Sequence, residues 1–343
     1  MLKLFQSIFG GNEQPGRYPE SLIEMAIERA VDGTDPRLRA VPAYRKQLRE
    51  PVIHAIDHVV ALVELLPAPL LAASSEFSRD PRLKALFVSP EHMREVFGND
   101  PQLSEFRDTN NGPGDGLTGL LLAERKEKQT FGMEVAGDTV RRDVAQMTVS
   151  FTHHRLIDLS ANEAETRRML RHRAFDHLIG IALSQISDAK SERVELKHRH
   201  ELLKGKLKVL QKGGWSFDDK AGEHADPATL QREFDDIEGQ LAALSIDDTT
   251  LNWQLDTLSK VLQEAEQQFW AENIDLYLDR MNIRRPAGDA DAQLVNFKEL
   301  HNVLGQNMVM LFVSISPDEL PKRKSFAENA DRCLAELGLS GQR

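Results

Sequence analysis

Two long heptad patterns constrain this chain more than any other feature of its sequence. Steps of four and three residues through 175–210 and through 230–276 meet an apolar residue at almost every position. The interruptions are Arg193, His200, Asp248 and Glu272. Both patterns extend past the ~3–4 heptads that separate a coiled coil from chance amphipathicity. The sequence therefore predicts two coiled-coil arms.

Glycine and Asp-Pro signals separate the two arms, so we expect an antiparallel coiled-coil hairpin over residues 163–281, with a loop at about 213–226. Residues 163–212 carry a net charge of +5 and residues 226–281 a net charge of −10, which favours pairing of the arms with each other. The stretch 245–250 is a weak point, where the second arm either continues or ends and restarts as a new helix. One hypothesis pairs Arg193 with Asp248 to fix the register, and the alternative is a solvated arginine beside a helix cap.

The apolar period changes from 3.6 to 2 after residue 107, which predicts a small antiparallel sheet. We expect strands at 117–124, 130–135, 145–152 and 308–315. The charged residues 125–128 are interpreted as the turn between the first two strands. Because the last of these strands follows the predicted hairpin, the hairpin is expected to be an insertion between strands of one sheet.

Helix start signals recur through residues 17–107, which predicts a helical region there. Proline follows a capping residue four times, and a missing N–H costs nothing at the first helical position. The caps are Asp35, Asp80, Ser89 and Asp100. We expect a helix to begin at each of them, and apolar residues of helical period at 22–30 and 52–63 indicate two further helix faces.

The predicted fold class is α+β, predominantly α. We divide the chain into a flexible N-terminal segment (1–16), the helical region (17–107), the sheet with a C-terminal helix (108–162 plus 290–343) and the coiled-coil hairpin (163–281). Cys333 is the single cysteine and excludes an intramolecular disulfide. The most apolar long stretch, 59–73, is interrupted by Glu64 and two prolines and is too short to span a bilayer. These features predict a cytoplasmic protein.

Few residues offer catalytic chemistry. His54 and His58 have the i, i+4 spacing that presents two imidazoles to one zinc ion, with Asp57 beside them. No third ligand is identifiable, so partly buried histidines are the favoured interpretation. The glycine-rich stretch 112–116 lacks the GK[ST] of a phosphate loop, and no nucleophile motif surrounds Cys333. We therefore assign no catalytic, cofactor or metal residues and expect no cofactor.

The charge distribution disfavours nucleic acid as a partner. Basic clusters at 167–173 and 197–200 share an arm with acidic residues in a chain of net charge −11, so charge matching within the hairpin explains them better. The apolar N-terminal cluster 2–9 leaves a peripheral membrane contact open, although Lys3 is its only cation.

Two function classes remain, and the sequence favours a non-catalytic protein over an enzyme. The first is a scaffold or adaptor that presents the coiled-coil hairpin to a protein partner, a role in protein–protein interaction. The alternative is a metal-dependent hydrolase that uses His54 and His58. The identity of the partner, any substrate and the oligomeric state do not follow from the sequence.

Overall fold

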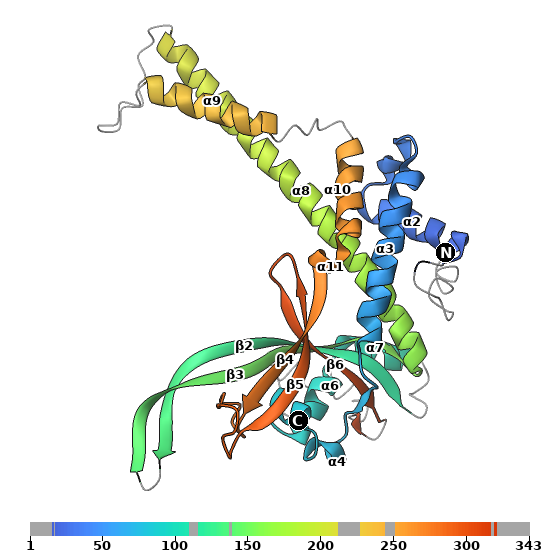
Figure 1. The fold of residues 1–343 in the computed structure, drawn as a ribbon, viewed down its shortest axis with the longest axis vertical. Helices are drawn as coiled ribbons and strands as arrows, with labels where there is room; N and C mark the ends of the chain where they lie inside the picture. The colour runs from blue at the N-terminus through green and yellow to red at the C-terminus, as the bar shows by residue number, and fades with distance from the viewer. Residues whose placement is uncertain are drawn as a thin grey trace, which may run out of the picture. The chain divides into compact units, whose positions relative to one another are not determined.

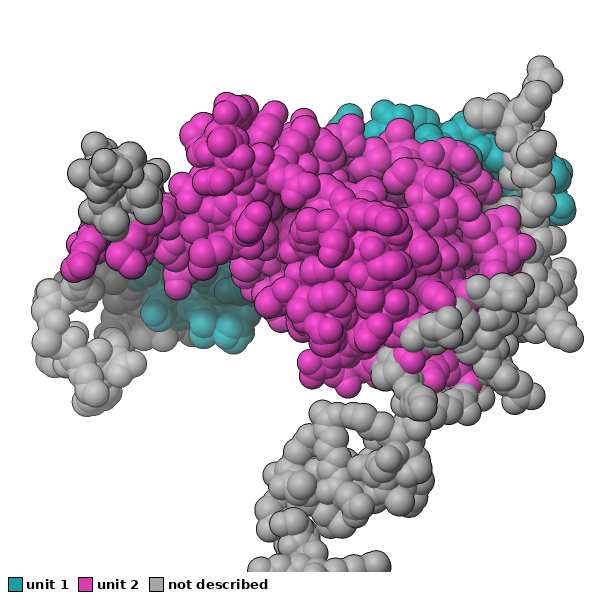
Figure 2. Space-filling view, turned by 90° about the horizontal axis from the view of Figure 1, so that it is seen from below, with its two compact units in different colours: residues 1–61, 172–268 teal, residues 62–171, 269–343 magenta. Residues whose placement is uncertain are grey.

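The computed structural model describes residues 16, 18–109, 116–136, 139–211, 227–243, 251–316 and 319–320. These residues form a mixed α+β fold with one six-stranded sheet. The chain folds into two compact units, residues 1–61 with 172–268 and residues 62–171 with 269–343 (Figure 2). This division differs from the predicted zones, because two long helices each pass from one unit into the other.

The first unit is helical (Figure 1). Its elements are α2 (Glu20–Thr34), η1 (Pro36–Ala40), most of α3 (Tyr44–Glu64), most of α8 (Glu163–Gln211), α9 (Pro227–Ala243), α10 (Leu251–Gln263) and α11 (Ala265–Gln268).

Close helix packing holds the first unit together. Gly33 on α2 lies so near α8 that an added Cβ would be 2.7 Å from Ile179 Cγ2. Beside this contact the Arg29 guanidinium forms an ion pair with the Asp176 carboxylate, and its Nε donates to Oδ1 at 2.6 Å. The fully buried apolar residues of these helices include Ala30, Leu38, Leu48, Ile56, Leu178, Ala182, Leu255 and Leu258. Gly33 therefore permits an approach of α2 to α8 that a larger residue would disturb.

The second unit is built on the sheet. Its helices are α4 (Ser74–Phe77), α5 (Pro81–Leu86), α6 (Pro90–Gly98) and α7 (Pro101–Thr109). Its strands are β1 (Leu70–Leu71), β2 (Leu117–Ala136), β3 (Thr139–Ser160), β4 (Phe269–Leu278), β5 (Gln293–Asn302) and β6 (Asn307–Ile315). The main path is β3-β2-β6-β5-β4 with antiparallel neighbours, and β1 pairs in parallel with β6.

Both faces of the sheet carry apolar clusters. The larger cluster joins one face to α5, α6 and α7 and includes Phe87, Met93, Phe97, Leu121 and Val313. The smaller cluster covers the opposite face with the last turn of α3 and the first turns of α8, and it includes Val63, Leu120, Leu170 and Phe312. Burial on both faces explains the almost continuous apolar run of β6.

Arg167 joins the smaller cluster to the end of α3. Its guanidinium donates to the backbone carbonyls of Val63, Leu66 and Pro67 at 2.9, 3.1 and 3.0 Å. The same group lies 4.8 Å from the centre of the Phe312 ring. One side chain thus caps three carbonyls at the end of α3 and forms a cation–π contact.

The structure confirms the four predicted helix starts. The side chains of Asp35, Asp80 and Ser89 accept hydrogen bonds from the backbone N–H groups of Arg37, Arg82 and His92. Asp100 accepts from the N–H of Leu103 and also from that of Leu156 on β3, so it ties α7 to the sheet. The helix after Asp35 is a 3₁₀ helix of five residues.

The predicted turn at 125–128 is wrong. These residues lie inside β2, which runs unbroken from Leu117 to Ala136 and pairs with β3 along its length. The charges resemble a turn signal because the strand leaves the apolar core there and its side chains enter ion pairs.

The predicted extension of the second arm to residue 281 is also wrong. Helix α11 ends at Gln268, and β4 follows as an edge strand paired with β5. Leu276 fits the heptad pattern, but it also fits the alternation of a strand, because Ile274, Leu276 and Leu278 lie on one face of β4. The helical insertion therefore occupies 163–268 and lies between β3 and β4 of one sheet.

Several predictions concern residues outside the described ranges. These are the N-terminal segment 1–15, the glycine-rich loop before Gly116, the loop 213–226, the stretch 245–250 with Asp248, and the C-terminal helix with Cys333. The coiled-coil geometry of the arms and the Arg193–Asp248 pair stay predictions. Among the described helices, none has the length and apolar composition needed to cross a membrane.

Candidate interaction surfaces

The two histidines of the predicted zinc spacing lie on α3, and both are half-buried. Asp57 between them is already engaged, because it accepts hydrogen bonds from the Tyr18 hydroxyl at 2.5 Å and from the backbone N–H of Gly16 at 2.9 Å. Within the part of the chain that the structure describes, no three His, Cys, Asp or Glu side chains gather as a metal site would require. His54 and His58 thus have no third metal ligand among the described residues.

The distal part of α8 packs against α9 to form a projecting pair, which we call the helical arm (residues 193–211 and 227–243; Figure 1). Its buried cluster consists of Leu203, Leu207, Leu230 and Ile237, with Leu196, Phe234 and Leu241 packed against it. His200 stacks on Phe234 with 4.4 Å between ring centres. His200, which interrupts the predicted heptad pattern, therefore packs against an aromatic ring of the other helix.

The helical arm also carries apolar side chains that α9 does not cover. Val194 is 65% exposed and Leu202 is 53% exposed. They lie eight residues apart, roughly 12 Å along the helix at ~1.5 Å per residue. Neither belongs to the cluster between α8 and α9. The arm thus has two apolar positions available beyond those used in its own packing.

A second projecting element is the two-stranded ribbon of residues 124–136 of β2 and 139–151 of β3, which we call the β-ribbon (Figure 1). The pairing of β2 with β6 ends at Ala123, so from Glu124 onward β2 pairs with β3 alone. Phe131 and Met133 on this ribbon are 72% and 67% exposed. Their alternation places both side chains on one face of the ribbon.

Ion pairs fix the base of the β-ribbon. Glu299 on β5 is only 1% exposed. Its carboxylate oxygens accept hydrogen bonds from Nε and Nη2 of Arg125 at 2.9 and 3.0 Å. Arg125 also binds Glu127, which accepts from Arg284 at 3.2 Å. Asn307 donates to Glu299 at 3.2 Å. The hydrogen bonds that Arg125 donates to Glu299 raise the pKa of Arg125 above its ordinary value. Burial acts in the opposite direction, and the charges of Glu299 and Glu127 add to the rise.

His154 is a half-buried histidine on β3 of the second unit. Its ring stacks on Phe87 with 5.1 Å between centres, and its Nε2 has no hydrogen-bond partner in the described structure. Burial lowers the pKa of His154, and the nearby His92 and His153 act in the same direction against a backbone hydrogen bond to Leu86. A neutral imidazole packed on an aromatic ring accounts for this residue without a catalytic role.

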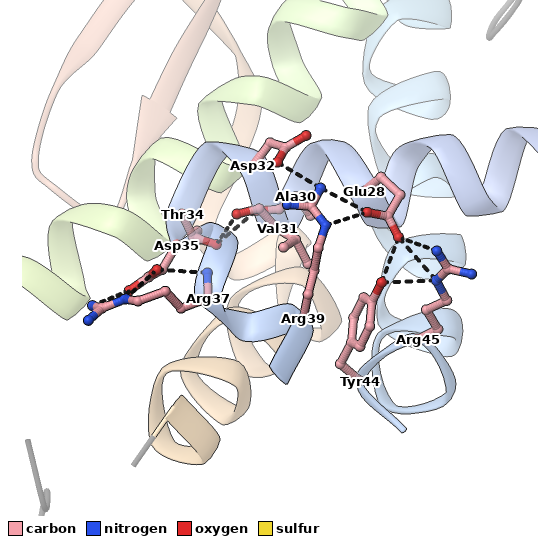
Figure 3. Close-up of polar contacts among 10 residues, drawn as sticks. All are labelled: Glu28, Ala30, Val31, Asp32, Thr34, Asp35, Arg37, Arg39, Tyr44 and Arg45. Atoms are coloured by element: carbon pink, nitrogen blue, oxygen red, sulfur yellow. Dashed lines mark hydrogen bonds and ion pairs between the residues drawn. The ribbon is translucent and has the colours of Figure 1, made fainter. Parts of the chain in front are cut away.

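The densest polar cluster of the first unit surrounds Glu28 (Figure 3). Its carboxylate accepts hydrogen bonds from the Tyr44 hydroxyl at 2.7 Å, from Arg39 at 2.9 Å and from Arg45 at 3.0 Å. Arg39 also reaches Asp32 at 2.7 Å and so ties η1 to α2. Because its donors and acceptors bind one another, this cluster holds α2, η1 and the start of α3 together and leaves little for a ligand.

The Glu28 cluster predicts an acid-sensitive contribution to stability. Burial alone would raise the pKa of Glu28, but the hydrogen bonds from Tyr44, Arg39 and Arg45 outweigh it and lower the pKa. A lowered pKa in the folded state means that the stabilisation is present above the unfolded pKa of ~4.5. It is lost as the pH falls below that value and through the folded pKa.

Replacing Glu28 with glutamine should therefore cost about 1 kcal/mol of unfolding free energy at pH 7, because the side chain is partly exposed. The deficit should shrink as the pH falls below about 4.5. Urea unfolding at several pH values measures both effects. Glu24→Gln on the same helix is the control, since Glu24 makes no hydrogen bond or ion pair with described residues. An equal loss in both variants would contradict the prediction.

Comparison with protein-family models, curated proteins and solved structures found no match to this chain. The functional interpretation therefore depends on the described surfaces. Sequence reasoning found the helical arm through its heptads, whereas it missed the β-ribbon. The alternation of Phe131 and Met133 did predict a strand at 130–135, but the turn expected at 125–128 divided it from 117–124, so the single long strand β2 was not predicted.

Proposed function

We propose that the protein is a non-catalytic cytoplasmic scaffold or adaptor that binds a protein partner through its helical arm. The exposure of Val194 and Leu202, on an arm whose own apolar cluster is already filled, carries this proposal. A projecting helix surface with separate apolar positions suits an amphipathic helix of a partner. The single cysteine is the feature that favours a reducing compartment.

The charges of the arm suit a protein partner better than nucleic acid. The exposed positions of α9 include Glu233, Asp235, Asp236 and Glu238, which would repel a phosphate backbone. The α8 side of the arm carries exposed Lys204, Lys206 and Lys208. A partner with a mixed charge pattern could therefore match both sides of the arm while its apolar residues cover Val194 and Leu202.

Replacing both exposed apolar residues should remove the partner without unfolding the arm. We expect Val194→Gln combined with Leu202→Gln to reduce partner recovery at least about tenfold, since burying such side chains contributes ~1–2 kcal/mol each. The measurement is affinity capture from an extract of the source cells with tagged full-length protein, followed by quantitative mass spectrometry.

The matched control is Glu195→Gln combined with Arg199→Gln, which changes two exposed polar positions of the same helix. Circular dichroism should show unchanged helix content in both double variants. A partner set that is the same for the apolar variant and for unchanged protein would reject the helical arm as the binding surface.

A further inference from the structure

The sheet of the second unit contains a fork along β6. On the side of β6 away from β2, pairing with β5 ends at Met310, and pairing with β1 begins at Val313. Between these two ladders Leu311 and Phe312 have a cross-strand partner only in β2. Strands β5 and β1 therefore diverge there, and an opening remains between them.

A pocket of about 340 Å³ occupies this fork. Its volume lies at the lower end of the ~300–1,000 Å³ typical of small-molecule sites, which suits a ligand with few atoms. Its lining comes from the segment after α3, from α5 and from the strands β4, β5 and β6. All of them belong to the second unit.

One wall of the pocket is apolar. Leu66 and Pro67 follow the end of α3, and Met310 and Phe312 come from β6. Leu66, Met310 and Phe312 belong to the same buried cluster, and Arg167 holds the Leu66–Pro67 segment through its backbone carbonyls. This wall is therefore fixed in place before any ligand arrives.

The other wall is polar and comes from two neighbouring strands. Lys298 donates through Nζ to the Asn273 side-chain oxygen at 2.8 Å, and the Asn296 amide donates to Oδ1 of Asp275. Both charged groups are thus held by neutral amides. Neither Lys298 nor Asp275 forms an ion pair with any residue that the structure describes.

Arg82 supplies a third charged group. Its Nε and Nη2 bind the Asp80 carboxylate, with 3.0 Å from Nε to Oδ1 and 2.6 Å from Nη2 to Oδ2. This pairing neutralises the charge of Arg82 but leaves its Nη1 group without a partner among described residues. The remaining charges of the lining, Lys298 and Asp275, sum to zero.

We propose that this pocket binds a free α-amino acid with an apolar side chain. The ligand carboxylate would accept from Lys298 and from Nη1 of Arg82, and its ammonium group would donate to Asp275. The ligand side chain would pack on Met310 and Phe312. A zwitterion satisfies one unpaired cation and one unpaired anion together, whereas a simple anion would face Asp275 and a simple cation would face Lys298.

Isothermal titration of the full-length protein tests this proposal with L-leucine, L-methionine and L-phenylalanine as probes. We expect saturable binding of at least one of them, with a dissociation constant in the micromolar to millimolar range. Each probe is matched by an analogue that lacks the amine and by one that lacks the carboxylate. Both analogues should bind at least about tenfold more weakly than the amino acid.

Two variants locate the binding. Lys298→Met and Asp275→Asn should each weaken binding at least about tenfold, while Lys128→Met, at an exposed position of the β-ribbon, should leave it unchanged. Because the analogue series uses unchanged protein, it tests the proposal even where a variant folds poorly. Absence of binding at millimolar amino acid, equal affinity for an analogue, or binding that survives both substitutions would each overturn the assignment.

Discussion

Replacing Arg125 with methionine should lower the free energy of unfolding by about 3–5 kcal/mol. The reason is that the Glu299 carboxylate, almost fully buried on β5, would lose the guanidinium that faces both of its oxygens. Asn307 would stay as a hydrogen-bond donor, and Nε2 of His301 lies 3.5 Å from Oε2, but neither replaces the two parallel hydrogen bonds of the guanidinium. Urea unfolding at pH 7 measures the loss.

A second variant separates the loss of the pair from the cost of a lone buried charge. Arg125→Met combined with Glu299→Leu should recover much of the stability, because an apolar pair of similar volume carries no desolvation cost. Arg125→Lys should lie between unchanged protein and Arg125→Met, since an ammonium group cannot form the two parallel hydrogen bonds. A double variant no more stable than the single one would show that the ion pair does not control this position.

The second large effect is expected at Arg167. Its replacement by methionine would leave the carbonyls of Leu66 and Pro67 without this donor and would leave Val63 with only the backbone N–H of Leu66. It would also remove the charge from the Phe312 ring. Hydrogen bonds to charged groups contribute ~1.5–3 kcal/mol each, and water can reach part of this site, so we expect a total loss of about 3 kcal/mol.

Thermal and urea unfolding of Arg167→Met measure this loss, with Arg79→Met as the control. Arg79 lies in the same unit and is paired with Glu76 at the surface, so its loss should stay within about 0.5 kcal/mol. Arg167→Lys should be nearly as unstable as the methionine variant, because a single ammonium group cannot donate to the three carbonyls as the planar guanidinium does. Equal stability of Arg79→Met and Arg167→Met would contradict the capping role.

Local signals predicted the helix starts well because their chemistry is short-range. Asp80 and Ser89 cap the residues two and three positions ahead, and no tertiary contact is needed for that bond. The strand near 145–152 was predictable from its alternation, which indicates burial of one face. The strands near 117–124 and 308–315 were predictable from short apolar runs, which indicate burial on both faces.

Long-range pairing limited what the sequence could predict. The charges at 125–128 resemble a turn until Glu299, more than 170 residues later, provides a buried partner. The sequence indicated this partner only through the position of Glu299, which continues the alternation of the buried residues Val295 and Phe297. The pocket residues on β4 were assigned to the predicted coiled-coil hairpin. The reason is that Leu276 fits both the heptad pattern and the alternation of a strand.

The order of strands in the sheet has a consequence for synthesis on the ribosome. β2 and β3 leave the ribosome before β4, β5 and β6, and about a hundred residues that contain α8, α9, α10 and α11 lie between β3 and β4. At ~5–20 residues per second the first hairpin waits on the order of ten seconds for its partner strand β6. During that interval Leu120, Leu121 and Leu122 have no β6 to pair with. Nascent chains of this protein should therefore depend on chaperones until β6 has left the ribosome and paired with β2.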